Sequence, residues 1–358
     1  MDKHIRLSDC FLFFNMIVIH PSHQYIEGQW IDPVCAKEKN LMDFSPCQNI
    51  MDNVSRVVIG KKRSIELLLV ALLAEGHVLL EDVPGVAKTL LAKCLAKSIG
   101  GVFNRVQFTP DLMPTDITGF NVFDPQSARF SFRPGPVMTH VLLADEINRT
   151  IPRTQSSLLE CMEERQVTID GQTHVLPSPF FVMATQNPIE LEGTFPLPEA
   201  QLDRFLLKTR LGYPDKQEEI AILERFQQAD PLQKLTAVAS PEEIIRLQAN
   251  RRNIVISEPV REYIADLVRA TRDHPAIQFG ASPRGSLSLM RAGQALAALQ
   301  HREYTLPDDI KSLAIPVLAH RLILKDQDRL RGALPEHILE ELVTQVPIPV
   351  GSGKTHAS

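Results

Sequence analysis

Aromatic residues and positive charge are both scarce in this 358-residue chain. Only 6% of its residues are aromatic, the formal net charge is −5, and the pI is near 6.1. Base-stacking platforms need several rings, and a general nucleic-acid surface needs excess positive charge. The composition therefore argues against nucleic acid as a partner, although it leaves room for a local basic patch.

Cysteine is also infrequent, and no Cys-x-x-Cys pair occurs. An odd number of widely spaced cysteines fits neither a disulfide framework nor a zinc site, so a reducing, cytoplasmic location is the simpler interpretation. The five cysteines are Cys10, Cys35, Cys47, Cys94 and Cys161.

No hydrophobic run is long enough to cross a membrane. Near the N-terminus the longest run covers residues 10–19 and is interrupted by Asn15, whereas a span needs about 20 apolar residues. Lys3 and Arg6 precede this run as in a signal peptide, but no small-x-small cleavage pattern follows. We therefore expect neither a membrane span nor a signal peptide.

The periodicity of the sequence predicts four regions. Residues 1–45 have no sustained period and form an N-terminal extension, disordered or upstream of a natural start at Met42 or Met51. Residues 46–212 alternate continuous apolar runs with helical patterns, which predicts a parallel sheet covered on both faces. Residues 213–342 are helical in pattern and predict a second, all-helical domain. Residues 343–358 are expected to be a flexible tail. The tail contains Gly351-Ser352-Gly353-Lys354-Thr355, but the chain ends before a helix could follow and bind phosphate.

Residues 76–91 have the layout of a phosphate-binding loop. An apolar strand enters a Pro-Gly turn, and Lys88-Thr89 then opens a helical pattern. Backbone N–H groups of such a turn and the positive end of the helix bind phosphate oxygens. The lysine would reach the β and γ phosphates, and the threonine hydroxyl would bind Mg²⁺. Asp82 and Ala87 stand where the general pattern has glycine, so the loop taken alone could also be a strand-turn-helix without a ligand. The predicted nucleotide-binding residues are Asp82, Val83, Pro84, Gly85, Val86, Ala87, Lys88, Thr89 and Leu90.

A second nucleotide signal follows 57 positions after Lys88. Four apolar residues, 141–144, lead into Asp145 and Glu146. Asp145 would belong to the Mg²⁺ shell and Glu146 would polarise the attacking water, because phosphoryl transfer depends on positioning and charge neutralisation. Such a run is common by chance, but together with the loop it predicts a nucleotide site.

Three further polar residues complete the predicted site. Asn187 follows the apolar run 180–184 at the end of its strand and would hold the water if that strand lies beside the first one; otherwise Asn-Pro is a turn. Arg204 and Arg284 are candidates for stabilising charge on the transferred phosphoryl group. Each arginine, taken singly, is also typical of an exposed surface.

Two hairpins are predicted within the α/β region. Alternating runs flank residues 124–127, and a second pair flanks Asp170-Gly171, which is a strong turn signal. Their simplest interpretation is stabilising decoration of the domain.

Together these motifs resemble the AAA+ ATPases, and among them the MoxR family. The similarity covers roughly residues 50–340 and rests on long motifs in order: 107–114, 116–119, 144–149, 159–167, 184–188, 196–205 and 317–321. It implies an α/β core with a parallel five-stranded sheet and a helical lid. It also implies Walker A at Lys88 and Thr89, Walker B at Asp145 and Glu146, and sensor 1 at Asn187. Arg204 corresponds to the arginine finger, and Arg284 to sensor 2.

The resemblance also implies how the protein works. An arginine finger acts on the ATP of a neighbouring subunit, so a ring is expected, a hexamer in this family, with ATP and Mg²⁺ as cofactors. The hairpins correspond to the helix-2 insert and the pre-sensor-1 hairpin, which in related motors point toward a central pore. Relatives assist metal-cofactor insertion or complex maturation with partners that carry a von Willebrand factor A domain. The alternatives are a nucleic-acid-dependent motor and an ATP-binding switch with little turnover.

Overall fold

The computed structural model describes residues 43–83, 85–126, 128–187, 193–227 and 230–348. Before them it describes only two short antiparallel strands, β1 (Gln24–Ile26) and β2 (Gln29–Ile31), within a separate unit of residues 1–42. The predicted extension therefore lies largely outside the described residues, as does the tail from residue 349 onward. Among the residues described, no helix combines the length and apolar character that a membrane span requires.

Five parallel strands form the central sheet, as the sequence predicts. Their order is β11-β3-β10-β7-β4, and every neighbouring pair is parallel. Continuous apolar strands are buried on both faces here, which is the usual condition of a parallel sheet. The strands are β3 (Val78–Glu81), β4 (Phe103–Gln107), β7 (Val141–Asp145), β10 (Phe181–Gln186) and β11 (Leu207–Thr209).

Strand β11 covers only three residues of the segment from Phe205 to Leu211. The backbone on either side of it is bound by side chains instead of by the sheet: the Phe205 carbonyl accepts from Arg321, and the Leu211 N–H donates to Asp82. These bonds satisfy the buried backbone groups without extending the ladder.

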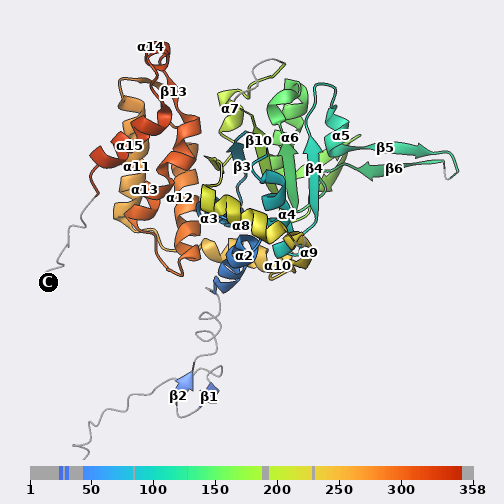
Figure 1. Cartoon of the computed structure of the whole chain (residues 1–358), viewed down its shortest axis with the longest axis horizontal. Coiled ribbons are helices and arrows are strands. Elements are labelled where there is room, and N and C mark those ends of the chain that lie inside the picture. Colours follow the sequence, from blue (N-terminus) through green and yellow to red (C-terminus); the bar gives the residue numbers. More distant parts are fainter. Residues whose placement is uncertain are drawn as a thin grey trace, which may run out of the picture. The chain divides into compact units, whose positions relative to one another are not determined.

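Helices cover both faces of the sheet (Figure 1). Nine of the twelve residues of α3 are buried, in keeping with its almost uniformly apolar sequence. The helices of this region are α2 (Ser45–Ser55), α3 (Lys62–Leu73), α4 (Lys88–Ser98), α5 (Pro114–Thr118), α6 (Pro152–Glu164) and α7 (Glu199–Leu202), with a 3₁₀ turn η1 (Ile147–Arg149).

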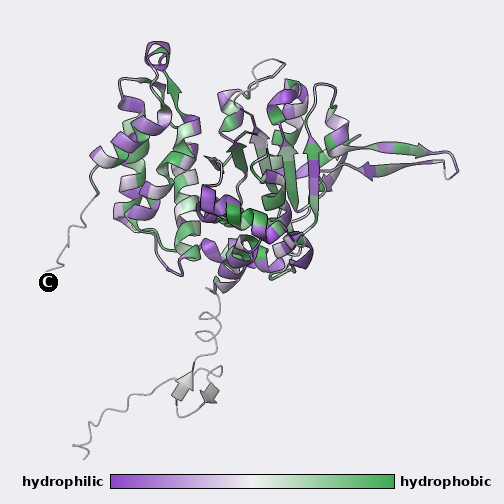
Figure 2. Cartoon of the chain, viewed as in Figure 1, coloured by the Kyte–Doolittle hydropathy of each residue, from purple (hydrophilic) through white to green (hydrophobic). Residues whose placement is uncertain are grey.

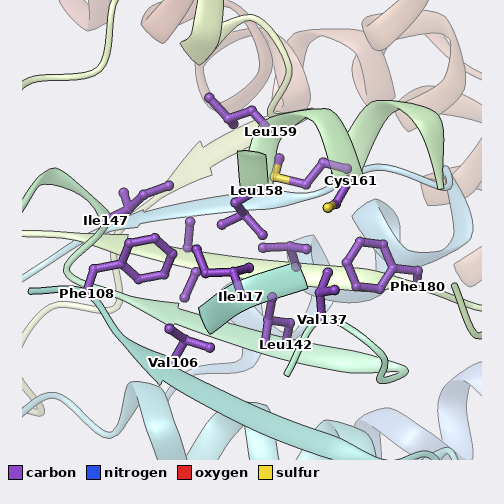
Figure 3. Close-up of a cluster of buried hydrophobic side chains, with 14 of the residues drawn as sticks. Val106, Phe108, Ile117, Val137, Leu142, Ile147, Leu158, Leu159, Cys161 and Phe180 are labelled. Atoms are coloured by element: carbon purple, nitrogen blue, oxygen red, sulfur yellow. The ribbon is translucent and has the colours of Figure 1, made fainter. Parts of the chain in front are cut away.

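One buried cluster fixes α6 against the strand that carries the two acids. Leu142 of β7 packs with Leu158 and Cys161 of α6 and with Ile117 of α5, and Phe180 closes one end (Figure 3). All of these side chains are almost completely excluded from solvent. Close packing of this kind resists small displacements, so the acids at the end of β7 have a rigid support.

Both predicted hairpins form, and they are linked to each other. The rings of Phe132 and His174 are stacked with centroids 3.9 Å apart, and Asn121 Nδ2 donates to Asp170 Oδ2 at 2.8 Å. The first hairpin projects from the domain (Figure 1), and its surface alternates hydrophobic and hydrophilic residues (Figure 2). The strands are β5 (Gly119–Asp124) with β6 (Arg129–Pro134), and β8 (Gln166–Ile169) with β9 (Gln172–Val175).

The C-terminal region is helical, as predicted, but it also holds a short antiparallel pair, β12 (Ile277–Phe279) with β13 (Ile323–Leu324). These strands of two or three residues are too short to produce a period in the sequence.

The predicted division at residue 212 remains a prediction, and α15 continues three residues past the predicted lid boundary at 342. The helices are α8 (Lys216–Phe226), α9 (Pro231–Lys234), α10 (Pro241–Arg251), α11 (Glu258–Asp273), α12 (Pro283–Leu299), α13 (Pro307–Leu318), η2 (Ala319–Arg321), α14 (Asp326–Leu330) and α15 (Pro335–Gln345).

Candidate nucleotide site

The loop after β3 folds tightly around the side chain of Lys88. The Lys88 ammonium donates to the carbonyl of Asp82 at 2.9 Å. Gly85 and Ala87 both take positive φ angles, +90° and +62°. The left-handed region costs a residue with a Cβ about 1 kcal/mol or more, which explains why the general pattern has glycine at the position of Ala87. Ala87 therefore adopts the left-handed backbone conformation that glycine adopts more easily.

Asp82, at the other position where glycine is absent, anchors the loop. Its buried carboxylate accepts hydrogen bonds from the N–H groups of Leu211 and Gly212, at 2.6 and 3.0 Å. These bonds tie the start of the loop to the end of β11, which is the neighbour of β3. An aspartate at this position thus has a structural role that glycine could not supply.

Helix α4 begins directly at the loop. Ala87 is its N-cap residue and supplies no side-chain cap, so the N–H groups of the first turn are not bound by a capping side chain. Such a helix start attracts anions.

Among the other predicted loop residues, Pro84 lies outside the described residues. Val83, Thr89 and Leu90 are half-buried along the loop and the first turn, and Val86 is buried.

The charge on Lys88 is balanced by three nearby carboxylates. Burial lowers the pKa of Lys88, and Asp145, Asp82 and Glu146 oppose that shift. The order of the sheet explains this proximity, since only β10 separates β3 from β7. The structure therefore brings the predicted loop and the two predicted acids together at one edge of the sheet.

Both acids are held by neighbouring side chains that the sequence did not single out. Asp145 Oδ1 accepts from the Thr185 hydroxyl at 2.6 Å, and Oδ2 pairs with Arg105 Nη2 at 2.6 Å. Glu146 Oε2 accepts from Gln107 Nε2 at 2.7 Å and lies 3.2 Å from Arg149 Nε. Arg105 and Gln107 are two residues apart on β4, so they point to the same face. If the pairing of β4 with β7 is known, this spacing predicts that both side chains lie beside the acids.

The donor set at this edge fits Mg²⁺. A carboxylate at Asp145 and a hydroxyl at Thr89 are oxygen ligands, and Mg²⁺ typically takes one or two protein ligands, with phosphate and water completing its shell. Within the described residues no cluster of three or more His, Cys, Asp or Glu side chains could hold a metal ion by itself. A cation bound here would accordingly depend on phosphate oxygens as well.

Asn187 lies where the sequence places it. It directly follows β10, whose residues Thr185 and Gln186 pair with the last residues of β3. The Asn187 side chain is buried. The condition stated for its role, a strand beside the first, is therefore met.

Arg204 and Arg284 lie at the opposite end of β3. They line a cavity of about 340 Å³ together with Gly76 and His77, which come before β3, whereas the loop comes after it. A strand of four residues is roughly 13 Å long. The structure thus brings the two arginines to each other and does not bring them to the loop of their own chain.

One carboxylate holds both arginines. Glu163, near the end of α6, lies 2.9 Å from Arg204 Nε and 2.5 Å from Arg284 Nη2. Asp203 lies 3.9 Å from Arg284 Nη1. Two cationic side chains on one acid leave the cavity rich in guanidinium groups, which suits an anionic ligand.

The helical region fixes the segment that carries Arg204. Buried Arg321 pairs with the carboxylate of Asp203 at 2.7 Å and donates to the carbonyls of Phe205 and Leu206 at 2.7 and 3.2 Å. Buried His320 contacts the Phe205 carbonyl through Nε2. Burial, together with the neighbouring Arg321 charge, lowers the pKa of His320 well below its usual value. The motif at 317–321 therefore connects η2 to the backbone around Arg204.

The loop follows β3, the second strand in the spatial order of the sheet, and the paired acids follow β7, the fourth. A parallel sheet with this order and these two features defines the core of an AAA+ ATPase. The model of the ATPase family associated with various cellular activities matches residues 77–207, and that of an AAA lid domain matches residues 269–342. This chain belongs to the MoxR family of AAA+ ATPases.

Its similarity to individual proteins extends over most of the chain. It is 51% identical to the protein YeaC of Bacillus subtilis over 84% of this chain and 94% of the relative. It is 43% identical to Chaperone MoxR1 of Mycobacterium tuberculosis over 83% of this chain and 80% of the relative. A solved structure of a candidate ATPase from Cytophaga hutchinsonii superposes with a TM-score of 0.83 at 39% identity, covering 89% of this chain and 99% of that one.

Proposed function

We propose that this protein hydrolyses ATP with Mg²⁺ at sites shared between neighbouring copies, and uses the cycle to remodel or activate partner proteins. The observation that carries the proposal is the separation of two half-sites. Lys88 and the acids lie at one end of β3, and Arg204 and Arg284 lie at the other.

At the loop, each residue has a role that fits its position. The N–H groups of the loop and the Lys88 ammonium bind the β and γ phosphates, as their donors require negative oxygens. Thr89 and Asp145 are the side chains that would hold Mg²⁺, which neutralises phosphate charge when bound. Glu146 polarises the attacking water, and Asn187 orients it.

The arginine half-site acts on a neighbouring copy. Arg204 and Arg284 stabilise charge that develops on the γ-phosphate at the loop of the next subunit, a function for which guanidinium groups are well suited. Such a head-to-tail contact repeats around a closed ring. A hexamer is the ring expected of the family.

The hairpins connect this cycle to a partner. β8 and β9 lie in the chain between α6, which follows the acids, and β10, which Asn187 directly follows. The Phe132–His174 stack joins them to the projecting hairpin, where Phe130 is 70% exposed. Movement at the nucleotide thus has a continuous path to an exposed apolar surface.

The relative named Chaperone MoxR1 supports a chaperone-like role. We infer a cytoplasmic protein whose partner carries a von Willebrand factor A domain, with metal-cofactor insertion or complex maturation as the outcome.

The test is phosphate release by the purified full chain, measured with and without Mg²⁺ over a range of protein concentrations. Glu146→Gln should still bind ATP but lose hydrolysis by about a hundredfold or more, since it removes the group that polarises water. Glu164→Gln, an exposed glutamate on α6, is the control.

Hydrolysis per subunit should rise as copies assemble. Equal phosphate release by the wild type and Glu146→Gln would overturn the proposal. Stimulation by DNA, with none by a partner protein, would favour the nucleic-acid motor instead.

A further inference from the structure

A single buried hydroxyl lies between the two acids of the nucleotide site. Thr185 is 0% exposed, and its Oγ1 donates to Asp145 Oδ1 at 2.6 Å. The same oxygen accepts the backbone N–H of Glu146 at 2.9 Å. Both contacts cross from β10 to the end of β7, its parallel neighbour.

The backbone of Glu146 needs such support. Its φ angle of +58° is in the left-handed region, where a residue with a side chain is strained. The strained peptide persists only if its surroundings hold it. The bond from the Glu146 N–H to Thr185 is one such constraint. Without it the N–H would lose its hydrogen-bond partner, which is unfavourable.

The carboxylate of Asp145 is fixed in the same way. Oδ1 is bound to Thr185 and Oδ2 to Arg105, which is partly exposed. With Oδ1 held by a buried group, the plane of the carboxylate cannot rotate freely. Oδ2, shared with the more accessible Arg105, is the oxygen left for exchange with a cation.

We propose that Thr185 is a positioning residue of the ATPase, and that its hydroxyl sets the orientation of Asp145 and Glu146 together. This inference rests on the function proposed above. Thr185 also lies two residues before Asn187, so one hydrogen-bonded group links the strand of the predicted sensor to the two acids. Partners that orient metal ligands typically contribute tenfold to a hundredfold to metal affinity or activity.

The experiment compares Thr185→Val, which removes the hydroxyl at nearly constant volume, with Thr185→Ser, which retains it. Thr271→Val is a matched control in α11. The Thr271 hydroxyl is equally buried, donates to the Val268 carbonyl at 2.6 Å and accepts the Ala281 N–H at 3.0 Å. The control therefore loses the same two kinds of bond in the helical region, and neither of them involves Asp145 or Glu146.

Three measurements are made on the full chain: binding of Mn²⁺ in the presence of ADP, hydrogen exchange of the Glu146 amide without nucleotide, and phosphate release. Thr185→Val should weaken Mn²⁺ binding about tenfold, speed exchange at Glu146, and slow phosphate release by about tenfold to a hundredfold. Thr185→Ser should restore most of each quantity. Thr271→Val should match the wild type in Mn²⁺ binding and in exchange at Glu146, even if it lowers the melting temperature.

Wild-type values of Mn²⁺ affinity and Glu146 exchange in Thr185→Val would overturn the inference. If Thr185→Val does not fold, Thr185→Ala supplies the same comparison with a smaller side chain. If the wild type itself releases no phosphate, the proposed ATPase fails, while the binding and exchange measurements still decide the role of Thr185.

Discussion

The two ends of strand β3 have opposite chemistry and are built in different ways. At the end that follows the strand, a short loop, a lysine and two acids come from two strand-to-helix connections of one sheet, after β3 and after β7. At the other end, Arg204 and Arg284 meet on Glu163, and three separate segments of the chain are needed to bring them together. The first end fits a phosphate with its cation, and the second supplies cations only.

This difference is the basis of the proposal that one copy is incomplete. The loop end can bind a nucleotide, but the arginines that would stabilise developing charge lie on the far side of the same strand. In the ring proposed here the arginine end of one copy completes the loop end of the next.

Mixing two inactive variants should restore activity. Arg204→Ala lowers hydrolysis by about a thousandfold, the usual contribution of a trans-acting arginine, and Lys88→Ala abolishes productive binding. In an equal mixture, roughly a quarter of the interfaces pair an intact loop with an intact arginine, so phosphate release should recover to about that share of the wild-type rate.

A mixture of Lys88→Ala with Glu146→Gln serves as the control, because both changes damage the loop end. It should stay inactive. If the Arg204→Ala mixture also stays inactive while the rings still assemble, the arginine acts within its own chain and the comparison of the two ends is wrong.

Acid should destabilise the arginine end selectively. His77 is fully buried in the cavity wall, and burial, with a smaller contribution from Arg165, lowers its pKa from 6.5 to about 3. Its Nε2 contacts the Met162 carbonyl and its Nδ1 accepts the Val182 N–H, which the neutral ring satisfies. The unfolded chain binds a proton below pH 6.5 and the folded chain does not. The contribution of His77 to the free energy of unfolding is therefore fully present above pH 6.5. It decreases as the pH falls toward 3, by up to about 1.4 kcal/mol per pH unit.

The measurement is the free energy of unfolding in urea between pH 6.5 and about pH 5, where most carboxylates stay ionised. His77→Asn should be less stable at neutral pH. Its unfolding free energy should change less steeply with pH, by the amount that corresponds to nearly one proton taken up on unfolding. His320, also buried with a lowered pKa, is present in both proteins and cancels in the comparison. Equal slopes for the two proteins would show that His77 does not titrate in this way.

The smallest effect is expected at Glu163. Replacing it with Gln removes the charge shared by Arg204 and Arg284 and leaves two like charges side by side. The pairs are partly exposed, so each is worth no more than about 1 kcal/mol, which corresponds to about a fivefold loss of phosphate release. Glu164→Gln, the next residue of α6, should have no effect. An increase in hydrolysis would mean that Glu163 restrains the arginines rather than positioning them.

Much of the loop end could be predicted from the sequence. Apolar runs, a Pro-Gly turn and paired acids are local patterns, and the structure confirms their strands and the parallel sheet. The Asp170-Gly171 hairpin likewise follows from its turn residues. Asp82 was predicted as a nucleotide-binding residue from its position alone; the anchoring of its carboxylate at Leu211 and Gly212 became visible only when β11 was placed beside β3.

Helix, strand and turn signals depend on neighbours a few positions away, so the elements and the residues that end them follow from local sequence. Which of those residues come into contact depends on the packing of the whole chain. In the local sequence, Thr185 is a residue of a buried strand and Arg284 is a charged residue at the start of a helix. Their partners, Asp145 and Glu163, are 40 and 121 positions away. Contacts over such separations depend on strand order and on how the helical region packs, and no local pattern records either of these.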